Sequence, residues 1–133
     1  IPWNRPGVDW RRYALVVIRS TWDYQHHAEN FLRTLAAIEA VTRLHNSAAI
    51  ARWNMRKTYL QELAAKGVPT VPTIWRDTLP RGGLLTVFDE LGADEAGIKP
   101  VMSGNPEGAW RLDRQRAKDW PACSRHISTG ARS

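Results

Sequence analysis

The chain has 133 residues, of which 43% are hydrophobic and 24% are charged. This length allows one domain with a substantial core and is short for two ordinary domains. The single cysteine excludes an intramolecular disulfide, and no apolar run approaches the roughly 20 residues that a membrane-spanning helix needs. We therefore expect a globular cytoplasmic protein.

The formal net charge of +6 is unevenly distributed along the chain. Residues 1–110 carry 13 basic and 11 acidic side chains, whereas residues 111–133 carry 6 and 2. The basic excess is therefore concentrated near the C-terminus, and a short basic end is more often solvated than bound to a partner. The charge does not favour a nucleic-acid-binding protein.

The first predicted elements are a strand and a helix. Residues 13–20, YALVVIRS, form a continuous apolar run rich in β-branched residues, which is typical of a parallel strand covered on both faces. Residues 28–41 place apolar side chains three and four positions apart, which predicts an amphipathic helix. A parallel strand needs a neighbour, and none precedes residues 13–20, so we expect part of this domain to be missing upstream.

Two short helices are predicted within residues 45–67. Asn46 or Ser47 caps the first helix, and Asn54 caps the second. Gly67 is expected to end the second helix, because glycine readily adopts the left-handed conformation that follows many helices.

The remaining elements continue the alternation of strands and helices. A strand begins near Pro72, residues 82–92 predict a helix, a buried strand ends at Lys99, and a second strand covers residues 109–112. Residues 122–133 show no periodicity and predict a divergent or disordered tail. The fold class is therefore α/β with α+β elements.

The loop after Lys99 is rich in small and turn-forming residues. It contains Ser103, Gly104 and Gly108. Backbone N–H groups of such a loop can surround an anion, and a lysine beside them is a compact, mobile charge that suits a phosphate. The alternative is a surface hairpin with a solvated lysine.

A resemblance to a known family rests on three segments. Residues 53–73, WNMRKTYLQELAAKGVPTVPT, and residues 97–111, GIKPVMSGNPEGAWR, together resemble the first half of an ATP-grasp nucleotide-binding unit. Residues 16–24, VVIRSTWDY, resemble the preceding domain in the branch that holds prokaryotic glutathione synthetase and cycloserine-biosynthesis ligases.

The resemblance implies an incomplete ATP-grasp fold. Residues 1–46 would be a partial substrate-side domain that precedes the ATP-grasp unit. Residues 47–121 would be the first, smaller nucleotide-binding subdomain, and residues 122–133 the tail.

The resemblance also implies a site and a reaction. Lys57 and Lys99 would reach the phosphates of ATP, and the loop with Ser103, Gly104 and Gly108 would close over them. Taken alone, Lys57 is an ordinary exposed lysine. The family joins a carboxylate to an amine or similar nucleophile through an acyl phosphate. It uses Mg²⁺, whose ligands lie in a second half that this sequence does not match, so we expect at most weak nucleotide binding and no turnover.

Arg19 and Asp23 are candidate substrate-binding residues. They follow the first predicted strand, at the end where open α/β sheets bind their ligands, and the Arg19 guanidinium suits a substrate carboxylate. The alternative is that Trp22 and Tyr24 pack under a loop while Arg19 and Asp23 form a local ion pair.

Two functions from different classes remain open. The first is a fragment of an ATP-dependent ligase. The second is a small interaction protein that reuses the ATP-grasp scaffold, as a homodimer that covers exposed strand edges. A third possibility, nucleic-acid binding through the basic tail, ranks last.

Overall fold

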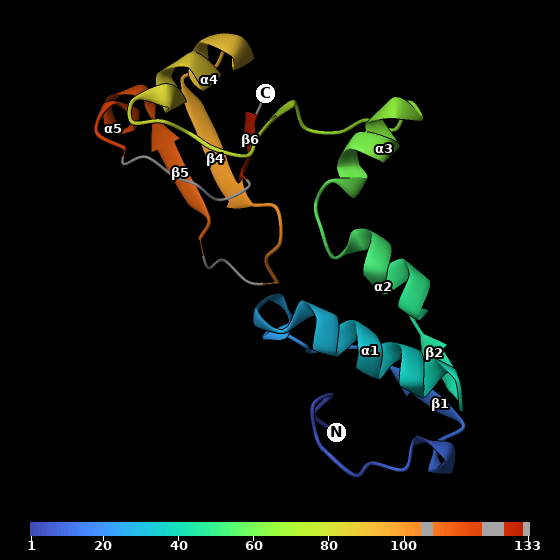
Figure 1. Cartoon of the computed structure of the whole chain (residues 1–133). Coiled ribbons are helices and arrows are strands. Elements are labelled where there is room, and N and C mark those ends of the chain that lie inside the picture. The colour runs from blue at the N-terminus through green and yellow to red at the C-terminus, as the bar shows by residue number, and fades with distance from the viewer. Residues whose placement is uncertain (105–107, 121–126, 132–133) are drawn as a thin grey trace. The chain divides into compact units, whose positions relative to one another are not determined.

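The computed structural model describes residues 1–104, 108–120 and 127–131, the last of these for the backbone alone. The chain divides into two compact units, Ile1–Arg56 and Lys57–Ser133. Figure 1 follows both units from the N-terminus to the C-terminus by colour.

The first unit is built on a pair of parallel strands. Val16 of strand β1 lies opposite Leu44 of strand β2, and helix α1 connects the two strands (Figure 1). The elements in chain order are the 3-10 turn η1 (Trp10–Arg12), β1 (Leu15–Val17), the 3-10 turn η2 (Tyr24–His26), α1 (Ala28–Glu39), β2 (Arg43–His45) and α2 (Ala48–Asn54).

The apolar face of α1 supplies most of the core of this unit. Phe31, Leu35 and Ile38 are each at most 4% exposed, as the predicted spacing requires. Leu44 of the adjoining strand β2 is also buried. The predicted helix is therefore confirmed, and its buried stripe holds the strand pair.

Strand β1 differs from its prediction. It spans three residues, and Leu15 and Val17 are 49% and 56% exposed, so the expectation of a strand covered on both faces is wrong in this structure. Among the described residues, its strand partner is β2, which was not predicted because a three-residue segment is too short to show a period.

The second unit is a four-stranded antiparallel sheet with helices. The strand order is β3-β6-β4-β5. Its elements in chain order are α3 (Tyr59–Ala65), β3 (Thr73–Arg76), α4 (Gly83–Leu91), β4 (Glu95–Pro100), β5 (Trp110–Asp113), α5 (Arg114–Lys118) and β6 (Ile127–Ala131).

Helices α4 and α5 lie on the same face of this sheet (Figure 1). Alternate residues of β4, Ala96 and Ile98, are buried with Phe88 of α4 and Ala117 of α5 in one core. Because side chains alternate along a strand, Lys99 projects from the opposite face of the sheet. The buried face therefore fixes where the candidate lysine points.

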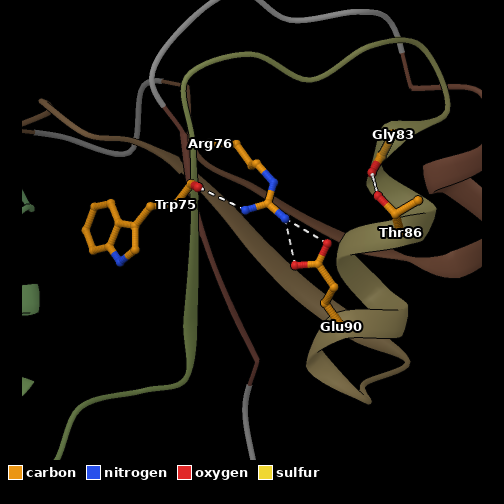
Figure 2. Close-up of polar contacts among 5 residues, drawn as sticks. All are labelled: Trp75, Arg76, Gly83, Thr86 and Glu90. Carbon is orange, nitrogen blue, oxygen red and sulfur yellow. Dashed lines mark hydrogen bonds and ion pairs between the residues drawn. The ribbon is translucent and has the colours of Figure 1, made fainter.

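A polar contact joins the end of β3 to α4 at the surface (Figure 2). Nη2 of Arg76 donates to both carboxylate oxygens of Glu90 at 2.7 Å, and Nη1 donates to the backbone oxygen of Trp75 at 3.2 Å. In the first turn of α4, the hydroxyl of Thr86 donates to the backbone oxygen of Gly83 at 2.7 Å. The ion pair links α4 to the edge strand β3 at the surface.

Two further expectations are corrected. Residues 127–131 form strand β6 between β3 and β4 and hydrogen-bond to a strand on each side, so of the predicted divergent or disordered tail, disorder is wrong for this segment. Asn54 is the last residue of α2 and caps no helix. Ser47 caps α2 by accepting from the backbone N–H of Ile50 at 3.3 Å, as one of the two predicted caps.

Candidate functional site

Lys57 lies in the turn that leads into α3, and not inside a helix. Its backbone N–H donates to the backbone oxygen of Val101 at 2.8 Å. Val101 is only 4% exposed and follows β4 directly. This hydrogen bond holds the backbone of Lys57 beside the end of β4, the strand that carries Lys99.

The Lys57 ammonium bridges the end of β4 and the loop that follows it. Nζ donates to the backbone oxygen of Pro100 at 2.8 Å and to Oγ of Ser103 at 2.6 Å. An ammonium has three donor hydrogens, so a third remains for another acceptor beside these two. The structure thus joins Lys57 to Ser103, one of the loop residues selected from the sequence.

Lys57 and Lys99 influence each other electrostatically. Burial lowers the pKa of Lys57, and the positive charge of Lys99 lowers it further. Both lysines line one pocket of about 1120 Å³ within the second unit. Two cations at one pocket favour an anion, because a negative charge between them relieves their mutual repulsion.

The loop after β4 returns against Pro100 at Gly108. Gly108 has φ +73°, and a Cβ atom there would lie 2.8 Å from Cγ of Pro100. Glycine is therefore required both for the left-handed backbone and for the close approach. Ser103 and Gly104 begin the same loop, whereas residues 105–107 lie outside the described residues.

The pocket has other lining residues that the sequence reasoning missed. Arg111 and Glu95 line it and form an ion pair between β5 and β4, with Nε of Arg111 3.1 Å from Oε2 of Glu95. Tyr59 and Trp110 add aromatic surface. The strand register that sets Arg111 opposite Gly97 explains the grouping, and it becomes visible only after pairing is known.

The acidic residues of this pocket do not make a magnesium site. Asp94 lies 3.3 Å from Nε of Arg114, and Glu95 is paired with Arg111, so both carboxylates already face cations. Over residues 1–104 and 108–120, no three histidine, cysteine or carboxylate side chains form a cluster suited to a metal. Within the described residues, this pocket therefore offers no cluster of three potential metal ligands.

Arg19 and Asp23 lie in the first unit, at a separate pocket of about 830 Å³. Oδ1 of Asp23 accepts a hydrogen bond from the indole Nε1 of Trp3 at 2.7 Å. Within the described part of the chain, Arg19 forms neither a hydrogen bond nor an ion pair. The alternative of a local Arg19–Asp23 ion pair is therefore wrong for this structure.

Solved ATP-grasp structures share this fold. The chain aligns with the crystal structure of D-cycloserine synthetase DcsG with a TM-score of 0.73 and 26% identity, covering 96% of this chain and 46% of that chain. It also aligns with the structure of the ATP-grasp ligase PsnB complexed with minimal precursor, with a TM-score of 0.52 and 19% identity, over 88% of this chain and 43% of that chain. The fold is thus a part of the ATP-grasp fold, as predicted.

The sequence comparisons indicate which ATP-grasp ligases this chain resembles. The cycloserine biosynthesis protein DcsG of Streptomyces lavendulae is 41% identical over an alignment of 133 residues, which covers 95% of this chain and 42% of that protein. A family model described as the N-terminal domain of D-cycloserine synthetase DcsG matches residues 1–46. The chain therefore resembles the N-terminal and central part of a DcsG-like ATP-grasp ligase, and it spans less than half the length of that curated relative.

The helices in the described part of the chain fall short of the length and apolar character of a membrane span.

Proposed function

We propose that this chain is the substrate-side and first nucleotide-side portion of an ATP-dependent carboxylate–amine ligase, and that alone it binds ATP weakly. The observation that carries the proposal is the pairing of Lys57 and Lys99 at one pocket, with Ser103 bonded to Lys57. Two ammonium groups and a hydroxyl are the kind of donors that bind a polyphosphate through charge-assisted hydrogen bonds.

The proposed reaction belongs to the longer ligase. A substrate carboxylate oxygen attacks the γ-phosphorus of ATP, and ADP leaves, which gives an acyl phosphate. The amine then attacks the acyl carbon, phosphate leaves with the bond electrons, and the nitrogen releases a proton as the amide forms. The lysines would neutralise charge on the phosphates during the first step, and the loop with Gly104 and Gly108 would close over them.

We further propose that the chain alone does not turn over ATP. The carboxylates at the pocket, Asp94 and Glu95, are already paired with arginines, and phosphoryl transfer depends on metal ions to neutralise its developing charge. Residues 1–46 would belong to the substrate-side domain and residues 47–121 to the nucleotide subdomain. The division into compact units falls ten residues later than this boundary, after Arg56.

Thermal unfolding with ATP tests the nucleotide assignment. At a hundredfold excess of ATP over its Kd, binding would stabilise the folded chain by about 2.7 kcal/mol and raise the Tm. Lys99→Ala should remove most of this shift, and Lys57→Arg should retain part of it. Lys66→Ala, an exposed lysine outside the pocket, is the matched control. The assignment fails if ATP raises the Tm of Lys99→Ala as much as that of the unmodified chain.

The alternative function is a homodimeric interaction protein. The exposure of Leu15 and Val17 on β1 supports it, because an apolar strand left open to water favours a covering partner. Light scattering over a dilution series tests this alternative. A species of constant monomer mass at every concentration would eliminate it.

A further inference from the structure

The pocket of the first unit has an apolar wall and two charged side chains. Among the described residues, one of the two is hydrogen-bonded within the protein and the other is not. The pocket has a volume of about 830 Å³, and among its lining residues the charged ones are Arg19 and Asp23. The apolar wall includes Trp3, Trp10, Tyr13, Trp22, Phe31 and Leu35. A largely apolar pocket with aromatic side chains and few charged groups is typical of a site for a small organic ligand.

Asp23 already has a partner inside the protein. Its Oδ1 accepts the indole N–H of Trp3 at 2.7 Å across 20 positions of sequence. The Trp3 ring also packs edge-on against Phe31, with ring centroids 5.2 Å apart and an interplanar angle of 81°. Phe31 is 4% exposed, so the ring of Trp3 rests on the fixed core. The hydrogen bond to Asp23 and the packing against Phe31 together fix the orientation of the Trp3 ring in the pocket wall.

Arg19, unlike Asp23, has no hydrogen-bonding partner within the described part of the chain. It lines the same pocket, and in the described part of the chain its guanidinium is paired with no carboxylate or carbonyl group. A guanidinium has five N–H donors arranged as a planar fork, which matches both oxygens of a carboxylate. Among the described side chains that line the pocket, Arg19 therefore offers an available guanidinium beside apolar surface.

We propose that this pocket binds a small carboxylate with an apolar body, with Arg19 as the partner of the carboxylate and Asp23 as a positioning residue that acts through Trp3. The proposal rests on the proposed function, because it deepens the ligase assignment by giving the chemical class of the acid. The proposal gives different roles to Arg19 and Asp23, which the sequence analysis had grouped as two candidate substrate-binding residues. An amino acid whose ammonium contacts Asp23 directly is the competing outcome.

The first test compares two probes on the whole 133-residue chain. Hydrocinnamate carries a carboxylate on a phenyl chain, and hydrocinnamamide is its neutral counterpart of nearly the same shape. NMR shifts of the tryptophan indole N–H signals report binding, and the Trp3 signal is identified by its loss in Trp3→Phe. We expect the carboxylate to bind about tenfold more tightly than the amide, because its hydrogen bonds are charge-assisted. Equal affinities, or no detectable binding of hydrocinnamate, overturn the proposal.

A variant pair assigns the preference to Arg19. Arg19→Gln should bring the two probes to the same affinity. Arg12→Gln removes an equal charge from a neighbouring exposed position that does not line the pocket, so the tenfold preference should remain. If Arg19→Gln keeps the preference for the carboxylate, the role of Arg19 is wrong.

A second variant set separates the positioning role of Asp23 from direct contact. Asp23→Asn keeps an oxygen acceptor for the Trp3 indole and removes the charge, so it should bind hydrocinnamate within about threefold of the unmodified chain. Asp23→Ala and Trp3→Phe should weaken both probes about equally, and their double variant should be no weaker. If phenylalanine binds more tightly than hydrocinnamate and loses this gain in Asp23→Asn, Asp23 contacts the ligand and the proposed division of roles is overturned.

The outcome is independent of the nucleotide test. Lys99→Ala should leave hydrocinnamate binding unchanged, and Arg19→Gln should leave the ATP shift in Tm unchanged. If ATP gives the unmodified chain no shift in Tm while the carboxylate preference is present, the nucleotide assignment alone is contradicted. The reverse result would contradict the acid pocket alone.

Discussion

Lys57 combines two roles at the scale of single residues. Its ammonium holds the loop through Pro100 and Ser103, and its partial burial beside Lys99 lowers its pKa. A cation kept in such surroundings costs stability, and an anion bound beside it would reduce that cost. We therefore expect an anion that binds at this pocket to stabilise the folded chain.

The lowered pKa of Lys57 gives a pH prediction with a definite sign. Between the folded pKa and the higher unfolded pKa, the unfolded chain binds more protons, so the free energy of unfolding rises with pH across that alkaline window. Denaturant titrations in mildly and more strongly alkaline buffer measure the rise. Lys57→Gln should show a smaller rise, whereas the exposed control Lys66→Gln should keep it. If the free energy of unfolding rises as much in Lys57→Gln as in the unmodified chain, the pH dependence does not come from Lys57.

Gly108 provides a second prediction at this scale. Gly108→Ala should destabilise the second unit by more than the roughly 1–2 kcal/mol of left-handed strain alone, because its Cβ would also meet Pro100 at 2.8 Å. Gly67→Ala is the matched control, with φ +80° and nothing within 4 Å of the added atom. Free energies of unfolding from denaturant titration compare the two. Equal losses would show that the contact with Pro100 carries no weight.

The contacts of Lys57 were easier to anticipate from the sequence than those inside the pocket of the first unit. Lys57 lies beside Lys99 at one pocket and is bonded to Ser103, and these tertiary contacts join Lys57 to residues more than 40 positions away. The bond from Trp3 to Asp23 was not foreseen. It joins positions without a shared periodic element, so no local pattern indicates it.

Helix α4 is held to the sheet mainly by its buried face, at the scale of elements. Phe88 and Val87 are almost fully buried, whereas the Arg76–Glu90 pair leaves its side chains 41% and 46% exposed (Figure 2). Exposed ion pairs contribute about 0.2–1 kcal/mol, while truncating a buried phenylalanine costs about 3–5 kcal/mol. The core therefore dominates the attachment of α4.

The contributions of the buried core and of the exposed ion pair to stability can be compared directly. Phe88→Ala should lower the free energy of unfolding by about 3–5 kcal/mol, and Glu90→Gln by no more than about 1 kcal/mol. Salt should reduce the effect of Glu90→Gln further, because screening weakens an exposed pair. A loss in Glu90→Gln as large as that in Phe88→Ala would show that the surface pair governs the attachment.

The elements that were predicted correctly are those with a strong local signal. Helix α1 has a complete apolar stripe, α4 lies between glycines, and β4 alternates buried and open residues. Strand β2 was missed because three residues are too few to show a period, and β6 was missed because its pairing partners specify it more than its own composition does. The burial of β1 was overestimated because an apolar run indicates a preference for cover, and does not identify the segment that provides it.

At the scale of the whole molecule, the chain comprises two compact units with separate pockets. It matches less than half of a curated ligase, so the full reaction belongs to the longer protein in our proposal. We expect the chain alone to release no ADP from ATP above the uncatalysed rate, with or without Mg²⁺. A coupled assay for ADP measures this, and turnover that disappears in Lys99→Ala would contradict the expectation.

The most direct test of the central claim is an NMR titration that follows the side-chain signals of Lys57 and Lys99 in the unmodified chain. We predict that ATP and pyrophosphate shift both lysine signals together, while adenosine shifts neither, because the two ammonium groups hold phosphates at one pocket. Saturating ATP that leaves both signals in place, or adenosine that moves them as far as ATP does, would contradict the account.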